Sequence, residues 1–155
     1  MFAPYVPSSI EVVTKMLEVA QVKPEDVLYD LGSGDGRVLI LAALQSGCHC
    51  IGIEQDTSLI SLADFAIHHF NLKNNIDIIE DDYRYVDLSP ASVVTVYLTR
   101  ETTNDLRSKF KRELKCGSRI VSHEYELEGW RHEVILGVPT MPSPNRHRVI
   151  LYKMS

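Results

Sequence analysis

The chain has 155 residues, the length of one domain, and 45% of them are hydrophobic and 24% charged. The formal net charge of −5 excludes a global basic field that would draw the chain to nucleic acid or an anionic membrane. No apolar stretch approaches the ~18–20 residues of a membrane span, and the N-terminus lacks the basic and apolar regions of a signal peptide. We therefore expect one soluble domain over residues 1–155.

Cysteine usage points to a reducing, cytoplasmic compartment. Cys48, Cys50 and Cys116 are too few and too unevenly spaced for a disulfide framework, and they lack the partners that a metal site needs. Cys48 and Cys50 are two residues apart in a predicted strand, so their side chains should share one face. We expect three reduced cysteines that serve packing, and no metal.

Strands and helices are predicted to alternate along most of the chain. Residues 8–21 carry apolar residues at helical spacing and predict an opening helix, with Ser8 as its N-cap and Glu11 completing a capping box. Later helices are predicted at 36–46, at 57–71 after a cap at Thr57 or Ser58, and at 101–115. Apolar runs predict five intervening strands, at 27–31, 49–54, 76–81, 91–98 and 118–125. This pattern is typical of a parallel sheet that helices cover on both faces.

The end of the chain changes character. Residues 132–138 and 147–153 predict two strands that a proline-rich loop joins without a helix, so the two should pair antiparallel. The predicted fold is α/β: a Rossmann-like doubly wound sheet of five parallel strands, closed by a C-terminal antiparallel hairpin. An ordinary dinucleotide-binding domain would instead continue with another helix and a parallel strand.

The most informative segment runs from Asp30 through Gly32 and Gly34 to Gly36, directly between a strand and a helix. Glycines there let the backbone turn tightly and approach a ligand, and the helix N-terminus presents backbone amides. The G-x-G-x-G spacing differs from the G-x-G-x-x-G of dinucleotide-binding loops. Asp30 and Asp35 would repel a pyrophosphate but attract a sulfonium and an α-amino group. The loop therefore suits a cationic ligand without phosphates.

Acidic residues also end the next two strands. Glu54 ends the second strand, where a carboxylate can accept hydrogen bonds from both ribose hydroxyls of a nucleoside. This feature fits a nicotinamide dinucleotide and S-adenosylmethionine alike. Asp82 and Tyr83 end the third strand, where Asp82 could accept from an adenine amino group, whereas Asp81 is expected to be solvated.

These features together resemble the class I S-adenosylmethionine-dependent methyltransferases, and the resemblance covers nearly the whole chain. Within that superfamily the chain is most similar to the small archaeal broad-specificity protein-lysine methyltransferases and to the mitochondrial lysine methyltransferases that act on an ATP synthase subunit. It resembles more distantly the histone lysine methyltransferase without a SET domain. The motifs that carry the narrower resemblance are PYVPSS (4–9), YDLGSGDGR (29–37), VVTVYL (93–98) and RIVSHEYELEGW (119–130).

The resemblance implies a role for each position of the cofactor site. Tyr5 and Ser8 would close over the methionine end; Asp30, Gly32 and Gly34 would hold the amino acid moiety; Glu54 would hold the ribose; Asp82 and Tyr83 would hold the adenine. Residues 97–99, Tyr-Leu-Thr, stand where relatives carry substrate-facing residues. Enzymes that methylate amino groups of nucleic acids or glutamine have Asn/Asp-Pro-Pro-Tyr there, so the departure argues against those substrates.

A lysine nucleophile must lose its proton before methyl transfer, since its reference pKa is about 10.4. Burial in an apolar or aromatic channel lowers that pKa. The residues that could line such a channel are Tyr5, Tyr97, His123 and Trp130, and the candidate proton acceptors are Glu101, His123 and Glu124. Of these, we assign Tyr97, His123 and Glu124 to the catalytic centre.

The sequence thus favours an S-adenosylmethionine-dependent protein-lysine N-methyltransferase. Two alternatives stay open: an RNA or small-molecule methyltransferase on the same fold, and a non-catalytic Rossmann-like binding module. Residues 107–115 carry five basic side chains on one predicted helix. This stretch is either a solvated helix face or a docking patch for an acidic protein or nucleic acid.

Overall fold

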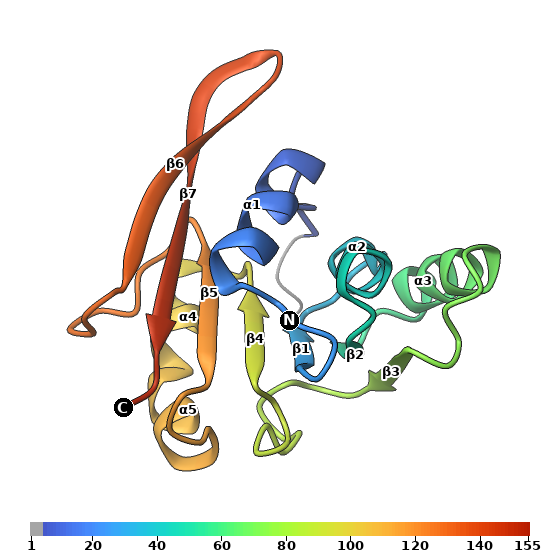
Figure 1. Cartoon of the computed structure of the whole chain (residues 1–155), viewed down its shortest axis with the longest axis horizontal. Coiled ribbons are helices and arrows are strands. Elements are labelled where there is room, and N and C mark those ends of the chain that lie inside the picture. The colour runs from blue at the N-terminus through green and yellow to red at the C-terminus, as the bar shows by residue number, and fades with distance from the viewer. Residues whose placement is uncertain (1–4) are drawn as a thin grey trace.

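The computed structural model describes residues 5–155, apart from the side chain of Pro144. Over this range the chain forms a seven-stranded sheet in the order β3-β2-β1-β4-β5-β7-β6 (Figure 1). The strands are β1 (Val27–Leu31), β2 (His49–Glu54), β3 (Ile76–Glu80), β4 (Val93–Val96), β5 (Arg119–His123), β6 (Val134–Thr140) and β7 (Ser143–Lys153). β1 to β5 run parallel, and β7 pairs antiparallel with both β5 and β6. The predicted fold class is confirmed.

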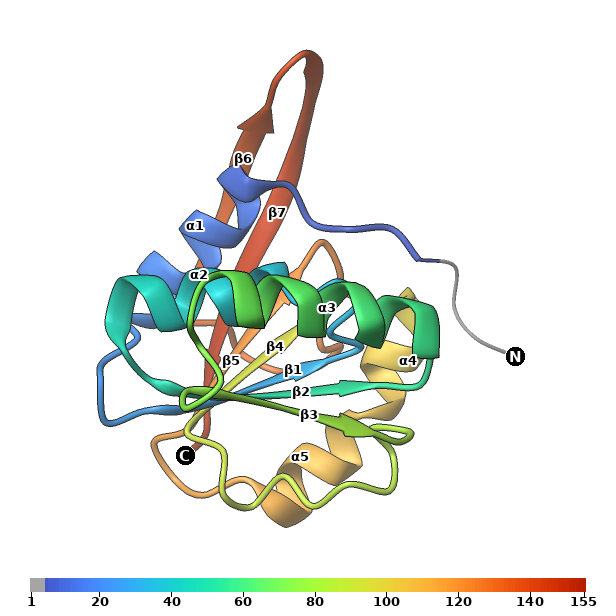
Figure 2. The same cartoon turned by 90° about the vertical axis from the view of Figure 1, so that its right-hand side faces the viewer.

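Helices cover both faces of the sheet (Figures 1 and 2). α1 (Ile10–Ala20), α2 (Arg37–Ser46) and α3 (Thr57–His69) lie over one face, and α4 (Arg100–Asp105) and α5 (Arg107–Glu113) lie over the other. Each face has its own apolar core: Val12, Met16 and Leu39 pack on the first, and Phe110, Ile120 and Tyr152 pack on the second. Within the described chain, no helix is long and apolar enough to cross a membrane.

Several predicted boundaries were wrong by a residue or more. Ser9, not Ser8, caps α1 by accepting from the amide of Val12, so the capping box with Glu11 is not formed. Asp56 caps α3 in place of the neighbouring hydroxyl residues, because its carboxylate accepts from the amides of Ser58 and Leu59. In both cases adjacent residues can cap equally well on sequence grounds, and the path of the preceding chain decides between them.

The predicted helix over 101–115 is two short helices that meet at Leu106. The predicted loop over 139–146 is also wrong. β6 continues through Thr140 and β7 begins at Ser143, so most of this stretch belongs to a long hairpin that rises beyond the rest of the sheet (Figures 1 and 2). Pro139 is tolerated within β6 because β6 is the edge strand of the sheet.

The packing role predicted for the cysteines holds for Cys48 and Cys50, whereas Cys116 is exposed. Cys48 and Cys50 are buried on the same face of β2 with their sulfur atoms 3.5 Å apart, and all three cysteines are free thiols. The first two fill space in the core between the sheet and α1 and α2. They therefore serve packing, as expected for reduced cysteines.

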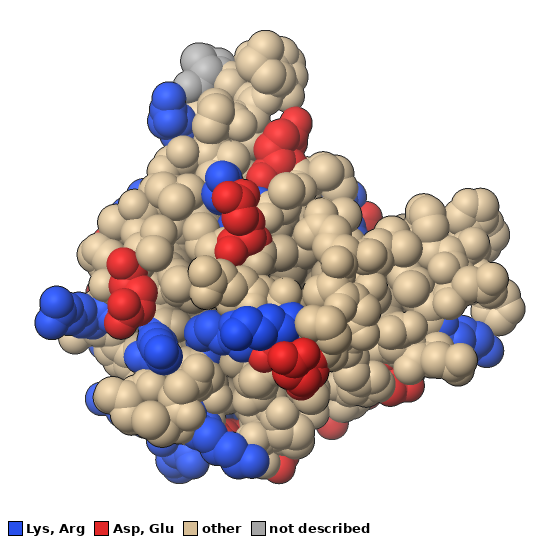
Figure 3. All heavy atoms as spheres, in the orientation of Figure 1, with Lys and Arg blue, Asp and Glu red and all other residues tan. Residues whose placement is uncertain are grey.

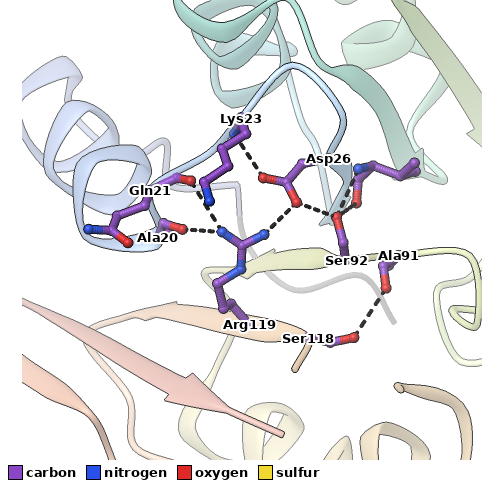
Figure 4. A network of polar contacts seen from close by, with 9 residues as sticks. Ala20, Gln21, Lys23, Asp26, Ala91, Ser92, Ser118 and Arg119 are labelled. Carbon is purple, nitrogen blue, oxygen red and sulfur yellow. Dashed lines mark hydrogen bonds and ion pairs between the residues drawn. The ribbon is translucent and has the colours of Figure 1, made fainter. Parts of the chain in front are cut away.

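A polar network ties the amino ends of three parallel strands to α1 (Figure 4). The Arg119 guanidinium of β5 donates to the carbonyls of Ala20 and Gln21 at the end of α1 and pairs with the buried Asp26 just before β1. Ser92, just before β4, donates its hydroxyl hydrogen to Asp26 at 2.7 Å and accepts from the amide of Val27. This end of the sheet is a structural lock, and the opposite end is left free for a site.

Candidate active site

A pocket of about 370 Å³ opens at the carboxyl ends of the parallel strands. Its walls come from the segments that follow β1, β2, β3, β4 and β5, together with the N-terminal segment over residues 5–8. β1 lies between β2 and β4, so the connections from β1 and β4 diverge to opposite faces at this point. Such a switch point in a doubly wound sheet is where ligands bind.

The glycine loop forms the floor of the pocket. Gly32 and Gly34 have φ values of +73° and +56°, which residues with a side chain rarely adopt. The ring of Tyr5 lies against Gly34 so closely that a Cβ added there would be 2.5 Å from Cε2 of the tyrosine. The absence of a side chain at Gly34 thus lets the N-terminal segment pack directly onto the backbone of the loop.

Arg37 fastens that segment in place. Its guanidinium pairs with Asp35 at 2.7 Å and donates to the backbone carbonyl of Ser8 at 2.9 Å. Burial alone would raise the pKa of Asp35, but the hydrogen bonds and charge of Arg37 outweigh it and lower that pKa. Burial and the neighbouring Asp35 raise the pKa of Tyr5. Arg37 follows the last loop glycine directly, but its sequence position alone does not indicate this contact with residue 8.

Glu54 is held rigidly at the end of β2. One carboxylate oxygen accepts from the amide of Gly34 at 2.8 Å, and the other accepts from the amides of Gln55 and Asp56 at 2.9 and 3.0 Å. A carboxylate oxygen can accept two hydrogen bonds, so the oxygen that faces Gly34 keeps acceptor capacity toward the pocket. Glu54 therefore lines the pocket, and its carboxylate also braces the glycine loop.

Asp30 is buried at the end of β1 and accepts from the hydroxyl of Thr95 at 2.8 Å. Burial raises the pKa of its carboxyl group to about 8, the hydrogen bond from Thr95 opposes this shift, and the charges of Glu54 and Asp35 add to it. A buried carboxyl group without a cationic partner is costly to ionise, so this position favours a ligand that brings a positive charge.

Asp82 and Tyr83 line the pocket beyond β3, as predicted. The guanidinium of Arg84 holds Asp82 through both carboxylate oxygens, and these hydrogen bonds lower the pKa of Asp82. Asp81 is exposed, as expected, but it also contributes to the rim of the pocket.

Aromatic and apolar side chains form the wall beyond β4. Tyr97, Leu98 and Thr99 line it together with Tyr125, which follows β5. The ring of Tyr97 stacks on that of His123, with ring centroids 3.7 Å apart, and burial raises the pKa of its hydroxyl group. The predicted substrate-facing stretch therefore lies at one end of the pocket.

His123 and Glu124 are placed differently from their predicted roles, because neither lines the pocket directly. His123 is almost fully buried behind the wall, and its Nδ1 lies 2.7 Å from the hydroxyl oxygen of Ser8. Burial, with a smaller effect of His147, lowers the pKa of His123 to about 3. Glu124 has a φ of +76°, and its carboxylate accepts from the amide of Arg148.

Two further candidates lie away from the pocket. Glu101 is exposed in the first turn of α4, and its carboxyl group belongs to that helix start. Trp130 packs edge-on between Phe110 and Tyr152 at the rim of the second core, so it does not line a substrate channel. Neither of these two candidates lines the pocket: Glu101 lies at a helix start, and Trp130 covers the edge of the second core.

The basic stretch over 107–115 is largely structural. Lys109 is buried and pairs with Glu113 at 2.8 Å, Arg107 donates to the carbonyl of Glu128, and Lys111 lies over the ring of Trp130. On the face shown in Figure 3, basic side chains are interspersed with acidic ones. This distribution favours a solvated helix face over a nucleic-acid patch.

The pocket fits S-adenosylmethionine by the chemistry of its lining. The buried Asp30 and the carboxylate of Glu54 suit an α-ammonium group and ribose hydroxyls. Asp30, Asp35 and Glu54 would all disfavour a pyrophosphate. The carboxylates that exclude a dinucleotide therefore match a cationic cofactor.

Comparison with known proteins agrees with this assignment. The sequence profile of a family described as "ANTKMT methyltransferase domain" matches residues 30–134. A protein-lysine N-methyltransferase of Saccharolobus islandicus (strain REY15A) is 37% identical over 150 residues, which are 96% of this chain and 92% of that protein. Mouse (Mus musculus) adenine nucleotide translocase lysine N-methyltransferase is 31% identical over 88% of this chain, which spans only 59% of that protein.

Among solved structures, the chain is similar to a protein described as an RNA methyltransferase from Salinibacter ruber, in complex with S-adenosyl-L-homocysteine. The TM-score is 0.89 at 33% identity, over 96% of this chain and 94% of that one. The bound S-adenosyl-L-homocysteine is what remains of S-adenosylmethionine after methyl transfer. The chain belongs to the ANTKMT methyltransferase domain family and is an S-adenosylmethionine-dependent methyltransferase of class I.

Proposed function

We propose that the chain is a protein-lysine N-methyltransferase. The observation that carries this proposal is the wall of Tyr97, Leu98 and Tyr125, which gives one end of an otherwise acidic pocket an aromatic and apolar surface. Aromatic faces attract an ammonium group, and an apolar channel favours the neutral amine that can act as a nucleophile. The names of the relatives from Saccharolobus and mouse support the same substrate class.

The acidic half of the pocket would hold the cofactor. In this assignment, Asp30, Gly32 and Gly34 hold the amino acid moiety, and Tyr5 and Ser8 cover it. Glu54 holds the ribose, and Asp82 and Tyr83 hold the adenine. S-adenosylmethionine supplies an activated methyl group on a sulfonium. The chain's own residues fix the acceptor in line with that group, and such positioning supplies several kcal/mol of the barrier reduction.

Tyr97 is the residue that we expect to contact the substrate, through its stacked ring. Its packing on His123 leaves the ring little freedom, so it presents a fixed surface to an incoming side chain. A rigid aromatic wall excludes water from the amine, which helps the amine to stay neutral. Of the three residues that we assign to the catalytic centre, Tyr97 lines the pocket, whereas His123 and Glu124 would act from behind this wall.

RNA is the second candidate substrate, because the structural neighbour from Salinibacter is described as an RNA methyltransferase. The net charge of −5 and the internal pairing of the basic stretch disfavour it. To distinguish a protein substrate from an RNA substrate, the purified protein is incubated with a cell lysate and labelled S-adenosylmethionine. Portions are then digested separately with protease and with ribonuclease. Label that protease releases and that hydrolysis yields as methyl-lysine supports lysine. Label that ribonuclease removes supports RNA.

A pair of substitutions tests the aromatic wall itself. Tyr97→Ala should raise the KM for a lysine substrate with little change in cofactor affinity, whereas Tyr97→Phe should keep most of the activity. Tyr85→Ala is the matched control, because Tyr85 is 77% exposed and outside the pocket. An unchanged KM in Tyr97→Ala would remove the wall from the substrate site.

A further inference from the structure

A chain of hydrogen-bonded side chains leads from the pocket toward the surface. It begins at Ser8, which lines the pocket and whose hydroxyl oxygen lies 2.7 Å from Nδ1 of His123. Nε2 of His123 in turn lies 2.9 Å from Nδ1 of His147 on β7. The side chain of His147 is 35% exposed, and so the chain ends at solvent.

The solvent end of this chain is next to a carboxylate. The carboxylate of Glu124 lies 3.9 Å from Nδ1 of His147, and one ring nitrogen of His123, one of His147 and one carboxylate oxygen of Glu124 lie within 4.8 Å of one another. Two further charged groups lie next to this carboxylate: the guanidinium of Arg148 pairs with Glu124 at 3.5 Å and lies 3.7 Å from the carboxylate of Glu126. Tyr97 stacks on His123 from the pocket side. A positive charge on His147 would therefore have a carboxylate beside it.

The middle member of the chain is suited to passing a proton rather than keeping one. His123 is 1% exposed, and burial keeps its imidazole neutral near neutral pH. A neutral imidazole carries one hydrogen, so one ring nitrogen donates while the other accepts. Its two hydrogen bonds can therefore run in either direction along the chain, from Ser8 to His147 or from His147 to Ser8.

We propose that Ser8, His123 and His147 form a proton relay that carries the proton of the substrate ammonium group from the pocket to the surface, where Glu124 stabilises the charged His147. This inference rests on the proposed lysine substrate. It makes His123, His147 and Glu124 positioning residues, which act on the amine through the hydroxyl group of Ser8.

The transfer balances as follows. The N–H bond of the substrate ammonium breaks and its proton joins the oxygen of Ser8, which gives its own hydrogen to Nδ1 of His123. His123 releases the hydrogen on Nε2 to Nδ1 of His147, so His123 ends neutral with its hydrogen on the other nitrogen. The amine is now neutral and nucleophilic, and His147 carries the positive charge. His147 then loses the proton on Nε2 to water. After the product leaves, a proton from water at Nε2 of His147 sends the hydrogens back along the chain to Ser8, and Ser8 releases one proton to water in the emptied pocket, which restores the start.

His147→Gln tests the relay, because glutamine can keep a hydrogen bond to His123 but cannot pass a proton on. At pH 7 we expect kcat on a lysine peptide to fall about 10²-fold, within the range typical of assisted proton transfer. The difference from the wild-type enzyme should shrink as the pH approaches about 10.4, the reference pKa of lysine, where water takes the proton unaided. The affinity for S-adenosylhomocysteine should stay the same.

His49→Gln is the matched control, because His49 lies at the amino end of β2, outside the pocket, and its side chain pairs with the exposed Asp77 at 3.3 Å. Its pH profile should equal that of the wild-type enzyme. A loss in His147→Gln that is equally large at every pH would indicate a purely structural role and overturn the relay. If His147→Gln methylates lysine as fast as the wild-type enzyme at pH 7, the relay is overturned but the proposed function is not. A wild-type enzyme that methylates no lysine would overturn the proposed function, and the relay with it.

A second measurement does not depend on turnover. The ¹⁵N chemical shifts of the histidine ring nitrogens report which nitrogen carries the hydrogen, and they can be recorded on the free protein. We expect His123 to stay singly protonated between pH 6 and 9, with its shifts altered by Ser8→Ala and by His147→Gln. A doubly protonated His123 in this range, or shifts insensitive to both substitutions, would overturn the relay.

Discussion

The ring of Tyr5 lies directly against Gly34, so that a residue with a side chain does not fit at position 34. A Cβ at position 34 would lie 2.5 Å from Cε2 of Tyr5, and the φ of +56° adds backbone strain for any residue with a side chain. This contact couples closure of the pocket to the shape of the glycine loop.

We therefore expect Gly34→Ala to weaken binding of S-adenosylhomocysteine by at least about tenfold, measured by calorimetry. The added Cβ would push the ring of Tyr5 away from the loop, and a loss of about 1.4 kcal/mol in binding is tenfold in Kd. Left-handed strain of about 1–2 kcal/mol lowers the stability of the folded protein but does not by itself change affinity. Gly47→Ala is the control, because Gly47 has a φ of +72° but nothing within 4 Å of the added carbon. It should lower stability to a similar extent and leave the affinity unchanged. Equal affinities in both variants would contradict the coupling.

Glu54→Gln tests the brace at the end of β2. The carboxylate accepts three backbone hydrogen bonds, and a glutamine amide group would turn donors toward at least one of them. Hydrogen bonds to charged groups contribute about 1.5–3 kcal/mol each, so we expect the Kd for S-adenosylhomocysteine to rise about 10- to 100-fold.

The control for this substitution is Glu80→Gln. Glu80 is the register partner of Glu54 on β3, but it is exposed and outside the pocket. Its substitution should leave the Kd within error of the wild-type value. A Glu54→Gln protein that binds as tightly as the Glu80→Gln protein would show that Glu54 contributes nothing to the cofactor site.

The parts of the site that the sequence predicts are local. Asp30, Gly32 and Gly34 follow one strand directly, Glu54 ends another, and a parallel sheet brings all such strand ends to one edge. The connection between Ser8 and His123 spans 115 residues, and no spacing rule reveals it. His147 enters only because β7 pairs antiparallel with β5 in a register that opposes Val149 to His123. That register depends on the length of the β6–β7 hairpin. The prolines in residues 139–146 favoured a loop on sequence grounds, so the length of the hairpin was not predicted.

Residues 97–99 and Trp130 show the same limit of prediction from sequence. Tyr97, Leu98 and Thr99 continue a strand and point to the pocket, as predicted. Trp130 lies in a loop whose return path over the second core depends on contacts with Phe110 and Tyr152. Local pattern fixes where a strand ends, whereas tertiary packing decides where a loop places its side chains.

Arg119→Met tests the structural lock at the far end of the sheet. The substitution leaves Asp26 buried without its cationic partner and frees two carbonyls of α1. Removing one partner of a buried pair typically costs about 3–5 kcal/mol, and we expect a loss of this size in the free energy of unfolding in urea. Arg112→Met is the control, since Arg112 is 67% exposed and should change stability by less than about 1 kcal/mol. A cofactor affinity that falls in Arg119→Met at temperatures where the protein is folded would contradict a purely structural role.

Asp30 should make the stability of the ligand-free protein depend on pH. Its pKa is about 8 in the folded protein, against an ordinary value of 3.8. Between these values the unfolded chain has lost a proton that the folded protein keeps, so stability falls as pH rises through this window. Asp30→Asn removes this contribution, and its stability relative to the wild-type protein should rise from pH 5 to pH 8 in urea unfolding. The exposed Asp64→Asn should show no such trend.

Binding of S-adenosylmethionine should show the opposite dependence on pH, because its α-ammonium group favours the ionised carboxylate of Asp30. Affinity should increase toward pH 8 in the wild-type protein and stay flat in Asp30→Asn. Parallel pH profiles for wild-type and Asp30→Asn proteins would mean that Asp30 does not titrate in the site.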